Sequence, residues 1–178
     1  MQRFVIVTGL PASGKSTVGA ALAAALQLPL LDKDAILEAL FDSLGVGDGV
    51  WRSQLSRAAD AVLQDLAMAS HGAVIVSWWR HPSSTLISGA TPDWLAALPG
   101  DVVELYCRCS PIVAVDRFFA RQRHAGHLDN LKSREQELVR FHQSAAHAAL
   151  GMHRLVETDT ERPTDLVVLL RALAPRAS

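Results

Sequence analysis

The chain alternates between two hydrophobic patterns, one typical of buried strands and one typical of amphipathic helices. Short runs rich in valine, isoleucine and leucine predict strands at residues 4–7, 29–31, 73–76, 102–107 and 154–157. Apolar residues spaced three and four apart predict helices at residues 15–26, 34–44, 53–70, 110–123, 134–150 and 163–173. Glycines at positions 45, 47 and 49 are expected to end the second helix, and Pro163 is expected to open the last one.

Strands that alternate with helices along a chain predict a parallel sheet with helices on both faces. The segment from His124 to Ser133 is polar and contains Gly126, so we expect a loop or lid within the domain rather than a linker between domains. The sequence shows no internal repeat and no low-complexity tract. The pattern therefore predicts one α/β domain over residues 1–178.

Composition narrows the class of protein. Of the 178 residues 49% are hydrophobic, and 17 basic and 18 acidic residues give a formal net charge of −1. The high apolar fraction with little net charge excludes intrinsic disorder, and the lack of a basic surplus argues against nucleic acid as a partner. Cys107 and Cys109 lie in an apolar run and are expected to be reduced core thiols. No apolar run reaches the roughly 20 residues of a membrane span, so we expect a cytoplasmic protein with no membrane partner.

The segment from Gly9 to Thr17, GLPASGKST, matches the pattern G-x-x-x-x-G-K-[ST] and stands after a strand and at the start of a helix. The glycines permit close backbone approaches, so that successive N–H groups can form a cradle for phosphate. Lys15 is suited to reach the β- and γ-phosphates, and Ser16 is suited to bind Mg²⁺. The predicted nucleotide-binding set in this loop is Gly9, Leu10, Pro11, Ala12, Ser13, Gly14, Lys15, Ser16 and Thr17.

The phosphate loop predicts triphosphate binding and leaves the base open. A guanine-specific switch would need an Asn-Lys-x-Asp string after a late strand. The nearest string, DNLK at residues 129–132, has the wrong order and does not follow an apolar strand. Adenine is therefore favoured, and ATP with Mg²⁺ is the expected cofactor pair.

Two carboxylates, Asp32 and Asp34, follow the second predicted strand, at the sheet edge where open α/β folds bind ligands. A carboxylate there can accept the proton of an alcohol and orient its oxygen for attack on a phosphoryl group. The alternative for Asp34 is that it only caps the helix that starts at Ala35. Asp32 could support Mg²⁺, contact the substrate or lie at the surface.

With these motifs placed, the chain resembles the small AAA-type P-loop kinases of the chloramphenicol phosphotransferase, zeta toxin and polynucleotide kinase type. The similarity rests on residues 9–17, on LDKDAI at 31–36 and on RFFARQRHAGH at 117–127. It implies a three-layer P-loop NTPase fold with a five-stranded parallel sheet in the order 2-3-1-4-5 and an arginine-bearing lid at about residues 117–133. It also implies that Asp34 faces the acceptor hydroxyl and that Thr160 lies beside the adenine.

Two positions depart from the pattern of these kinases. Many of them carry an arginine three positions after the acidic residue, where this chain has Leu37, and the difference weakens the case for a polynucleotide 5′-hydroxyl kinase. P-loop enzymes commonly end the third strand with an aspartate that serves Mg²⁺ through water. Here Ser77 follows that strand, so metal support is expected from Ser16 with Asp32, Asp34 or water.

Adjacent tryptophans after the third predicted strand offer an apolar wall for the acceptor. Trp78 and Trp79 should point in opposite directions, so at most one is expected to face the site. The alternative is that both rings pack under a loop. Arg80 and His81 either contact the substrate or lie at the surface. The predicted substrate-binding set is Asp34, Trp78, Trp79 and Arg80.

Three arginines fall in the segment that resembles the lid. Arg117 and Arg121 are four residues apart on one face of a predicted helix, and Arg123 lies near its end, where we expect it to contact nucleotide. A lid arginine stabilises charge on a transferred phosphoryl group and is worth about 10³–10⁵-fold in rate. The alternative is a solvated basic face. His124 and His127 are expected to be polar loop residues rather than metal ligands. The predicted catalytic residues are Asp34, Lys15, Arg117 and Arg121.

The sequence thus predicts an ATP-dependent phosphotransferase that moves the γ-phosphoryl group of ATP to a hydroxyl of a small molecule, such as an antibiotic, a sugar or a nucleoside-like metabolite. A nucleic-acid or nucleotide kinase is one alternative, which salt-sensitive binding of oligonucleotides would favour. An ATP-binding regulatory module without an acceptor is the other. The identity of the acceptor and the oligomeric state are open.

Overall fold

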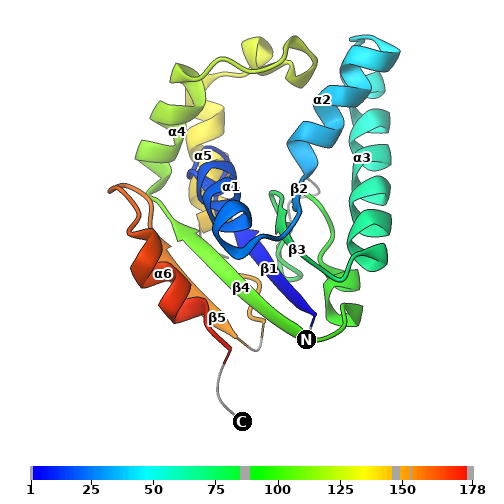
Figure 1. Ribbon diagram of the computed structural model, residues 1–178. Coiled ribbons are helices and arrows are strands. Elements are labelled where there is room, and N and C mark those ends of the chain that lie inside the picture. Colours follow the sequence, from blue (N-terminus) through cyan, green and yellow to red (C-terminus); the bar gives the residue numbers. More distant parts are fainter. Residues whose placement is uncertain (1, 85–88, 146–148, 153, 176–178) are drawn as a thin grey trace.

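The computed structural model of the protein describes residues 2–84, 89–145, 149–152 and 154–175, and shows a parallel sheet with helices on both faces (Figure 1). The strands are β1 (Arg3–Thr8), β2 (Leu30–Asp32), β3 (Gly72–Val76), β4 (Asp101–Arg108) and β5 (Leu155–Asp159). The helices are α1 (Lys15–Leu26), α2 (Lys33–Leu44), α3 (Gly49–Ala69), α4 (Pro111–Ala120), α5 (Arg134–Ala145) and α6 (Leu166–Leu173). Short 3₁₀ helices lie at Asp93–Ala97 (η1), Ala125–His127 (η2) and Asp129–Leu131 (η3).

The five strands are all parallel and lie in the order β2-β3-β1-β4-β5. This confirms the expected P-loop fold and its strand order. Every residue of β3 is buried, as are the last five of β1, because these strands have neighbours on both sides and helices on both faces.

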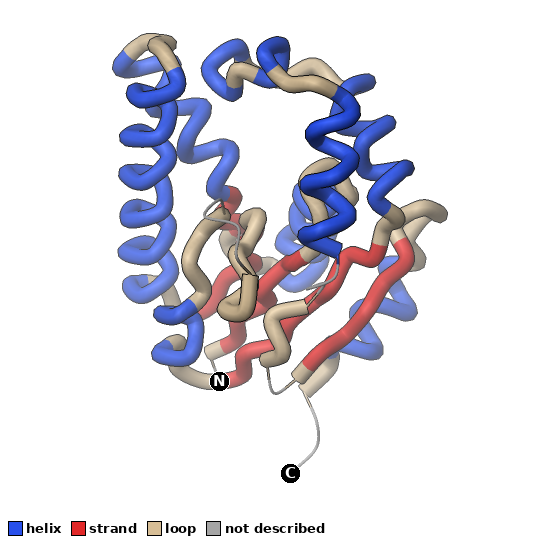
Figure 2. Tube along the Cα trace, turned by 180° about the vertical axis from the view of Figure 1, so that it is seen from behind, coloured by secondary structure: helices blue, strands red, loops and turns tan. Residues whose placement is uncertain are grey.

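Alternate residues of β1 support the two layers of the core. Val5 and Val7 point to the face covered by α1 and α6. Phe4 and Ile6 point to the opposite face, which is covered by α3 and the segment around Leu95. Figure 1 shows α1 and α6 in front of the sheet, and Figure 2 shows the other face. The predicted helices on both faces are therefore present.

Two helices begin three or more residues away from the predicted position, and in both cases an aspartate cap determines the first residue of the helix. Asp48 accepts hydrogen bonds from the backbone N–H groups of Val50 and Trp51, at 3.0 and 2.9 Å, so α3 begins at Gly49 instead of residue 53. The preceding helix, α2, ends at Leu44 with Gly45 as its C-cap, as predicted, and Gly49 is the first residue of α3. Asp165 likewise caps α6, so that helix does not begin at Pro163.

The helices on either side of the predicted lid end earlier than expected. Backbone dihedrals become extended at Arg121, so α4 ends at Ala120 rather than at residue 123. The described part of α5 ends at Ala145, and residues 149 and 150 are not helical. The part of the prediction at residues 146–148 lies outside the described residues. Because α4 ends early, the segment between α4 and α5 is longer than predicted.

Parallel strands place their carboxyl ends at one edge of the sheet, where open α/β folds bind ligands. Above this edge, α2 and α3 rise on one side and α4 and α5 on the other, with the segment that contains η2 and η3 between their tops (Figures 1 and 2). None of the described helices has the length and apolarity to cross a membrane.

Candidate active site

The phosphate loop adopts a backbone that its glycines make possible. Gly9 has a φ of +136°, and a Cβ there would lie 2.6 Å from the carbonyl oxygen of Cys107. Gly14 has a φ of +94° and is the N-cap residue of α1. Side chains of Leu10 and Ser13 are buried beneath the loop, so these two residues can serve a ligand only through their backbone. The loop is the concave cradle that phosphate binding needs.

Lys15 is the first residue of α1 and is buried under this loop. Its Nζ donates hydrogen bonds to the carbonyl oxygens of Gly9 and Leu10, at 2.9 and 2.6 Å. Burial lowers the pKa of Lys15 from 10.5 to about 8, while the nearby carboxylates of Asp34 and Asp32 act in the opposite direction. The two carbonyl groups therefore hold the ammonium in place without cancelling its charge. Lys15 also lines a cavity beside the loop.

A cavity of about 640 Å³ runs along the carboxyl edge of the sheet. This volume suits a small ligand or cofactor. Its lining at the β2 and β3 end includes Asp32, Asp34, Arg52, Ser77 and Trp78. Its lining at the β4 and β5 end includes Arg117, Phe118, Thr160, Pro163 and Leu166. The phosphate loop contributes Pro11, Ala12, Gly14, Lys15, Ser16 and Thr17 between these ends.

The two predicted carboxylates have different surroundings. Asp32 is the N-cap of α2 and accepts a hydrogen bond from the backbone N–H of Asp34 at 2.9 Å. Burial raises the pKa of Asp32, and a hydrogen bond with the Ser16 hydroxyl opposes that shift. Asp34 lies inside the first turn of α2, so capping does not account for its position. Its half-exposed carboxylate pairs with Arg123.

Only one of the two adjacent tryptophans faces the cavity. Trp78 lines it, and the Arg140 guanidinium lies over its ring, with 4.7 Å between Cζ and the ring centroid. Trp79 is buried in the core, where its indole N–H donates to the carbonyl of Val7 at 3.1 Å. The prediction that Trp79 binds substrate was therefore wrong, for the reason that adjacent side chains of an extended segment point to opposite sides.

Arg80 does not reach the site either. Its backbone N–H donates to the carbonyl of Ala90 at 2.8 Å, beside a short parallel bridge between Trp79 and Ala90. Among the described residues that line the cavity, Arg80 is not found, which corrects its prediction as a substrate-binding residue.

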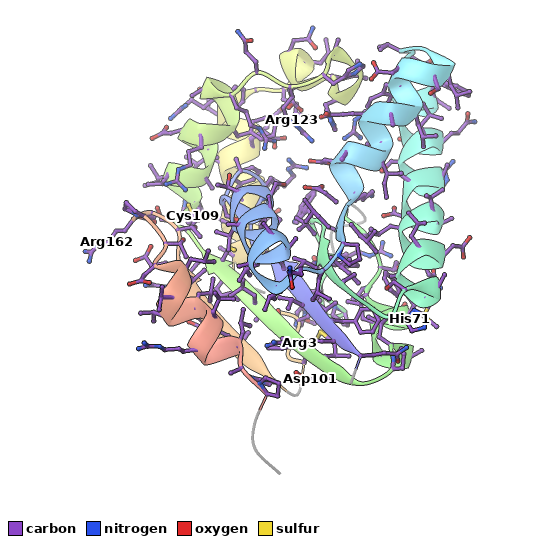
Figure 3. The ribbon with its side chains drawn as sticks, in the orientation of Figure 1. Arg3, His71, Asp101, Cys109, Arg123 and Arg162 are labelled. Carbon is purple, nitrogen blue, oxygen red and sulfur yellow. The ribbon has the colours of Figure 1, made fainter. Side chains whose placement is uncertain are left out.

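The three predicted lid arginines all line the cavity, but they do not share a helix face. Arg117, on α4, donates from Nη2 to the carbonyl of Thr160 at 2.8 Å and so ties α4 to the end of β5. Arg121 lies at the C-cap of α4, with Cζ 4.9 Å from the Phe118 ring centroid. Arg123 lies beyond the helix, under the segment that leads to α5 (Figure 3).

Arg121 and Arg123 differ in how their charges are balanced. Arg123 pairs with Asp34 and also with Asp129, the latter at 3.3 Å. Arg121 has no carboxylate within pairing distance in the described part of the chain, and its buried Nε has no hydrogen-bond partner there. Burial lowers the pKa of Arg121, and the charge of Arg123 adds to this effect. An anion in the cavity would find Arg121 available.

The segment that follows these arginines packs against α2. His124 pairs with Asp42 at 3.1 Å, and the buried His127 pairs with Glu38 at 2.8 Å. Gly126 lies so close to the Phe41 ring that a Cβ would approach its atoms to 2.4 Å. The histidines thus attach the lid to α2. Within the described residues, no group of histidine, cysteine and acidic side chains is arranged to hold a metal ion.

Several lining residues were missed by the sequence analysis: Arg52, Lys132, Arg140, Arg162, Pro163, Thr164 and Leu166. Arg52 fell just outside the predicted helix at 53–70, and recognising Asp48 as a cap would have placed it on α3. Arg140 could have been assigned to a helix, but no local pattern shows that this helix returns over Trp78. Ser77 lines the cavity with a buried hydroxyl that has no partner among the described residues.

The depressed pKa of Lys15 gives an expected pH dependence of nucleotide binding. Lys15 is charged below about pH 8 and neutral above it, and phosphate binding favours the charged form. Above pH 8 the dissociation constant of ADP should therefore rise with pH, by up to about tenfold per unit. Titration calorimetry from pH 7.5 to 9.5 measures this, because phosphate itself is already ionised there, its second pKa being about 6. A constant affinity across that range would contradict the assignment.

A phosphate loop, a basic cavity and this sheet order together define a P-loop nucleotide-binding protein with a kinase-like fold. Residues 4–143 match the family model AAA_33, described as an AAA domain, and the chain belongs to that family. A comparison with curated protein sequences gave no significant match.

Solved structures show the same architecture. A candidate kinase from Chloroflexus aurantiacus J-10-fl is 27% identical, with a TM-score of 0.75 and 95% of each chain covered. A gluconokinase from Sinorhizobium meliloti 1021 is 19% identical, with a TM-score of 0.55 over 97% of this chain and 89% of the other. A shikimate kinase from Bacteroides thetaiotaomicron is 15% identical, with a TM-score of 0.56 over 96% and 93%.

Proposed function

We propose that the protein is an ATP-dependent kinase that transfers a phosphoryl group to a hydroxyl of a small molecule. The observation that carries the proposal is that one cavity brings together Lys15 of the phosphate loop, the carboxylate of Asp34 and the lid arginine Arg121. These are a phosphate-binding cation, a proton acceptor and a stabiliser of phosphoryl charge. The kinases among the solved structures of this fold add support.

In this proposal the nucleotide lies along the phosphate loop toward β5. Backbone N–H groups of residues 9–17 and the start of α1 hold its phosphates. Thr160 and Arg117 lie at the far end of the cavity and are assigned to the adenosine part. The carbonyl of Thr160 is held by Arg117, so this end of the cavity is braced by α4.

Residues suited to Mg²⁺ lie between the two ends of the cavity. The Ser16 hydroxyl and the Asp32 carboxylate hydrogen-bond to each other, and both line it. The Ser77 hydroxyl lines it too, buried and without a partner among the described residues. Oxygen ligands of this kind fit Mg²⁺, which usually keeps several waters. Ser16 and Asp32 would hold the ion, directly or through water, and the bound ion would neutralise charge on the phosphates.

Asp34 is assigned as the proton acceptor for the substrate hydroxyl. Its carboxylate takes the proton while the hydroxyl oxygen attacks the γ-phosphorus, and the bond from that phosphorus to the bridging oxygen of ADP breaks. Lys15 and Arg121 stabilise the charge on the transferred group. Arg123 pairs with Asp34 and so orients it.

An ADP-release screen over neutral, carboxylated and phosphorylated alcohols, nucleosides and short oligonucleotides tests the proposal. We expect at least one small alcohol to raise ADP release above basal hydrolysis and to yield a phosphate ester by mass spectrometry. Nucleotide binding without phosphorylation of any compound would instead favour the regulatory module. Phosphorylation of oligonucleotides alone would make the protein a nucleic-acid kinase.

A further inference from the structure

The charges that line the cavity are not balanced by its own carboxylates. Among the described residues, eight cationic side chains line it against the two carboxylates of Asp32 and Asp34. The cations are Lys15, Arg52, Arg117, Arg121, Arg123, Lys132, Arg140 and Arg162. The proposed nucleotide accounts for those beside the phosphate loop and β5. It does not account for Arg52 and Arg140, which lie with Trp78 and Asp34 on the acceptor side.

Arg52 projects into the cavity from α3 without a carboxylate partner. Its Nε donates to the carbonyl of His127 at 3.1 Å, which fixes the guanidinium in the site. No acidic group of the described chain lies within ion-pairing distance of it, although Asp129 and Asp34 act on it from further away. Burial has the largest influence on the pKa of Arg52 and lowers it, because removal from water disfavours the charged form of the guanidinium.

Arg140 reaches the same region from α5, on the other side of the cavity (Figures 1 and 2). Its guanidinium is stacked over the Trp78 ring, and one of its Nη atoms forms an ion pair with the buried carboxylate of Glu137. Its Nε is buried and has no partner in the described part of the chain. The positive charge of Arg140 also lowers the pKa of Arg52, so these two cations repel each other across the cavity.

The other two cations on this side are paired with carboxylates at the cavity. Lys132 pairs with Asp129, and Arg123 pairs with both Asp129 and Asp34. Arg52 has no carboxylate partner in the described chain, and Arg140 keeps a buried Nε without a partner there beside its ion pair with Glu137, so both can donate to a ligand from facing walls. Guanidinium groups bind carboxylates and phosphates with two parallel hydrogen bonds, and an anion between them would remove their repulsion.

We propose that the acceptor alcohol carries an oxyanion, either a carboxylate or a phosphate, that binds between Arg52 and Arg140 while its hydroxyl faces Asp34. The apolar part of the acceptor packs on Trp78. This inference rests on the proposed kinase function and narrows its substrate class. A neutral alcohol would leave the partly buried guanidinium of Arg52 without an anion and the buried Nε of Arg140 without an acceptor, which is costly in a site of low dielectric.

Phosphorylation of matched triplets of acceptors tests whether the site prefers a charged substrate. Each triplet presents one carbon skeleton as a neutral alcohol, as its carboxylate and as its phosphate ester, over pentoses, hexoses, cyclic polyols and nucleosides. We expect ADP release and phosphate-ester formation with a charged member, at a kcat/KM about 10–100-fold above its neutral counterpart, as a charge-assisted hydrogen bond implies. The preferred member shows whether the anion is a carboxylate or a phosphate. Equal or better phosphorylation of the neutral members would overturn the inference and leave the kinase proposal standing.

Two variants connect that preference to the assigned residues. Arg52→Gln and Arg140→Gln should each raise KM for the charged acceptor by about tenfold or more, with a smaller effect on kcat. Together they should remove the preference for the charged member of a triplet. Arg57→Gln on α3 and Arg134→Gln on α5 are the controls, because both arginines are exposed and neither lines the cavity. Loss of activity toward charged and neutral acceptors alike would contradict the anion site.

If no compound is phosphorylated, a binding experiment still tests whether an anion binds between Arg52 and Arg140. The same carboxylates and phosphate esters are titrated calorimetrically into protein saturated with ADP and Mg²⁺, so that the nucleotide's phosphate positions are filled. Wild type should bind at least one charged compound about tenfold or more tightly than the Arg52→Gln/Arg140→Gln double variant does. If the two proteins bind every charged compound equally, or neither binds any, the inference fails. If wild type binds selectively but transfers no phosphate, the kinase proposal fails and the anion site stands.

Discussion

Asp34→Asn should reduce kcat for phosphoryl transfer by about 10²–10⁴-fold, the usual contribution of a positioned general base. The asparagine keeps the size and the first-turn position on α2 but cannot accept the hydroxyl proton. Asp34 does not cap α2, since Asp32 does, so helix formation should survive the change. The affinity for ADP should change little below the pKa of Lys15, because Asp34 is not assigned to the nucleotide and acts on its binding only through the charge of Lys15. Steady-state kinetics with the best acceptor, together with ADP calorimetry, measure both quantities.

Asp42→Asn is the matched control for this prediction. Asp42 lies on the same helix, is exposed and pairs with His124 of the lid, but it does not line the cavity. Its variant should retain nearly full activity. Asp34→Asn also releases Arg123 from its ion pair, so Arg123→Gln must be measured beside it. Near-normal kcat in Asp34→Asn would remove Asp34 as the base, whatever Arg123→Gln does.

The features predicted best from sequence are those that short stretches of chain determine. The phosphate loop needs φ above zero at Gly14 and close contact with Cys107 at Gly9, which its glycines signal locally. Buried strands such as β1 and β3 carry continuous apolar runs, and the resemblance to P-loop kinases supplied the order of the sheet. Asp32 and Asp34 follow their strand directly, so their place at the sheet edge followed from the fold.

The features missed depend on contacts between distant parts of the chain. Arg52 and Arg140 lie 88 positions apart, and they line one cavity only because α3 and α5 flank the same edge of the sheet. Whether Trp78 or Trp79 faces the site is set by the pairing of the next segment with Ala90, which has no local signature. The early end of α4 at Ala120 likewise escaped the helical pattern, although it decides where Arg121 points.

The structure distinguishes Arg117 from Arg121, which the sequence placed together as catalytic residues, and both of them from Arg123. Arg117 is engaged with the carbonyl of Thr160, and Arg123 with two carboxylates. Arg121 contacts the Phe118 ring and has a buried Nε without a partner in the described chain. A cation that is to stabilise charge on a phosphoryl group must be free of competing carboxylates at that moment. Arg121 meets this condition best, and its rigid aromatic neighbour holds the guanidinium in place.

Arg121→Gln should therefore lower kcat by about 10³–10⁵-fold, the range for an arginine that stabilises the transferred phosphoryl group. ADP lacks the γ-phosphate, so its affinity should change little. Arg117→Gln should instead weaken nucleotide binding, because it frees the loop after β5. Single-turnover measurements with saturating ATP separate these effects, with Arg134→Gln as the surface control. A loss below tenfold in Arg121→Gln, together with a loss above 10³-fold in Arg123→Gln, would transfer the role to Arg123.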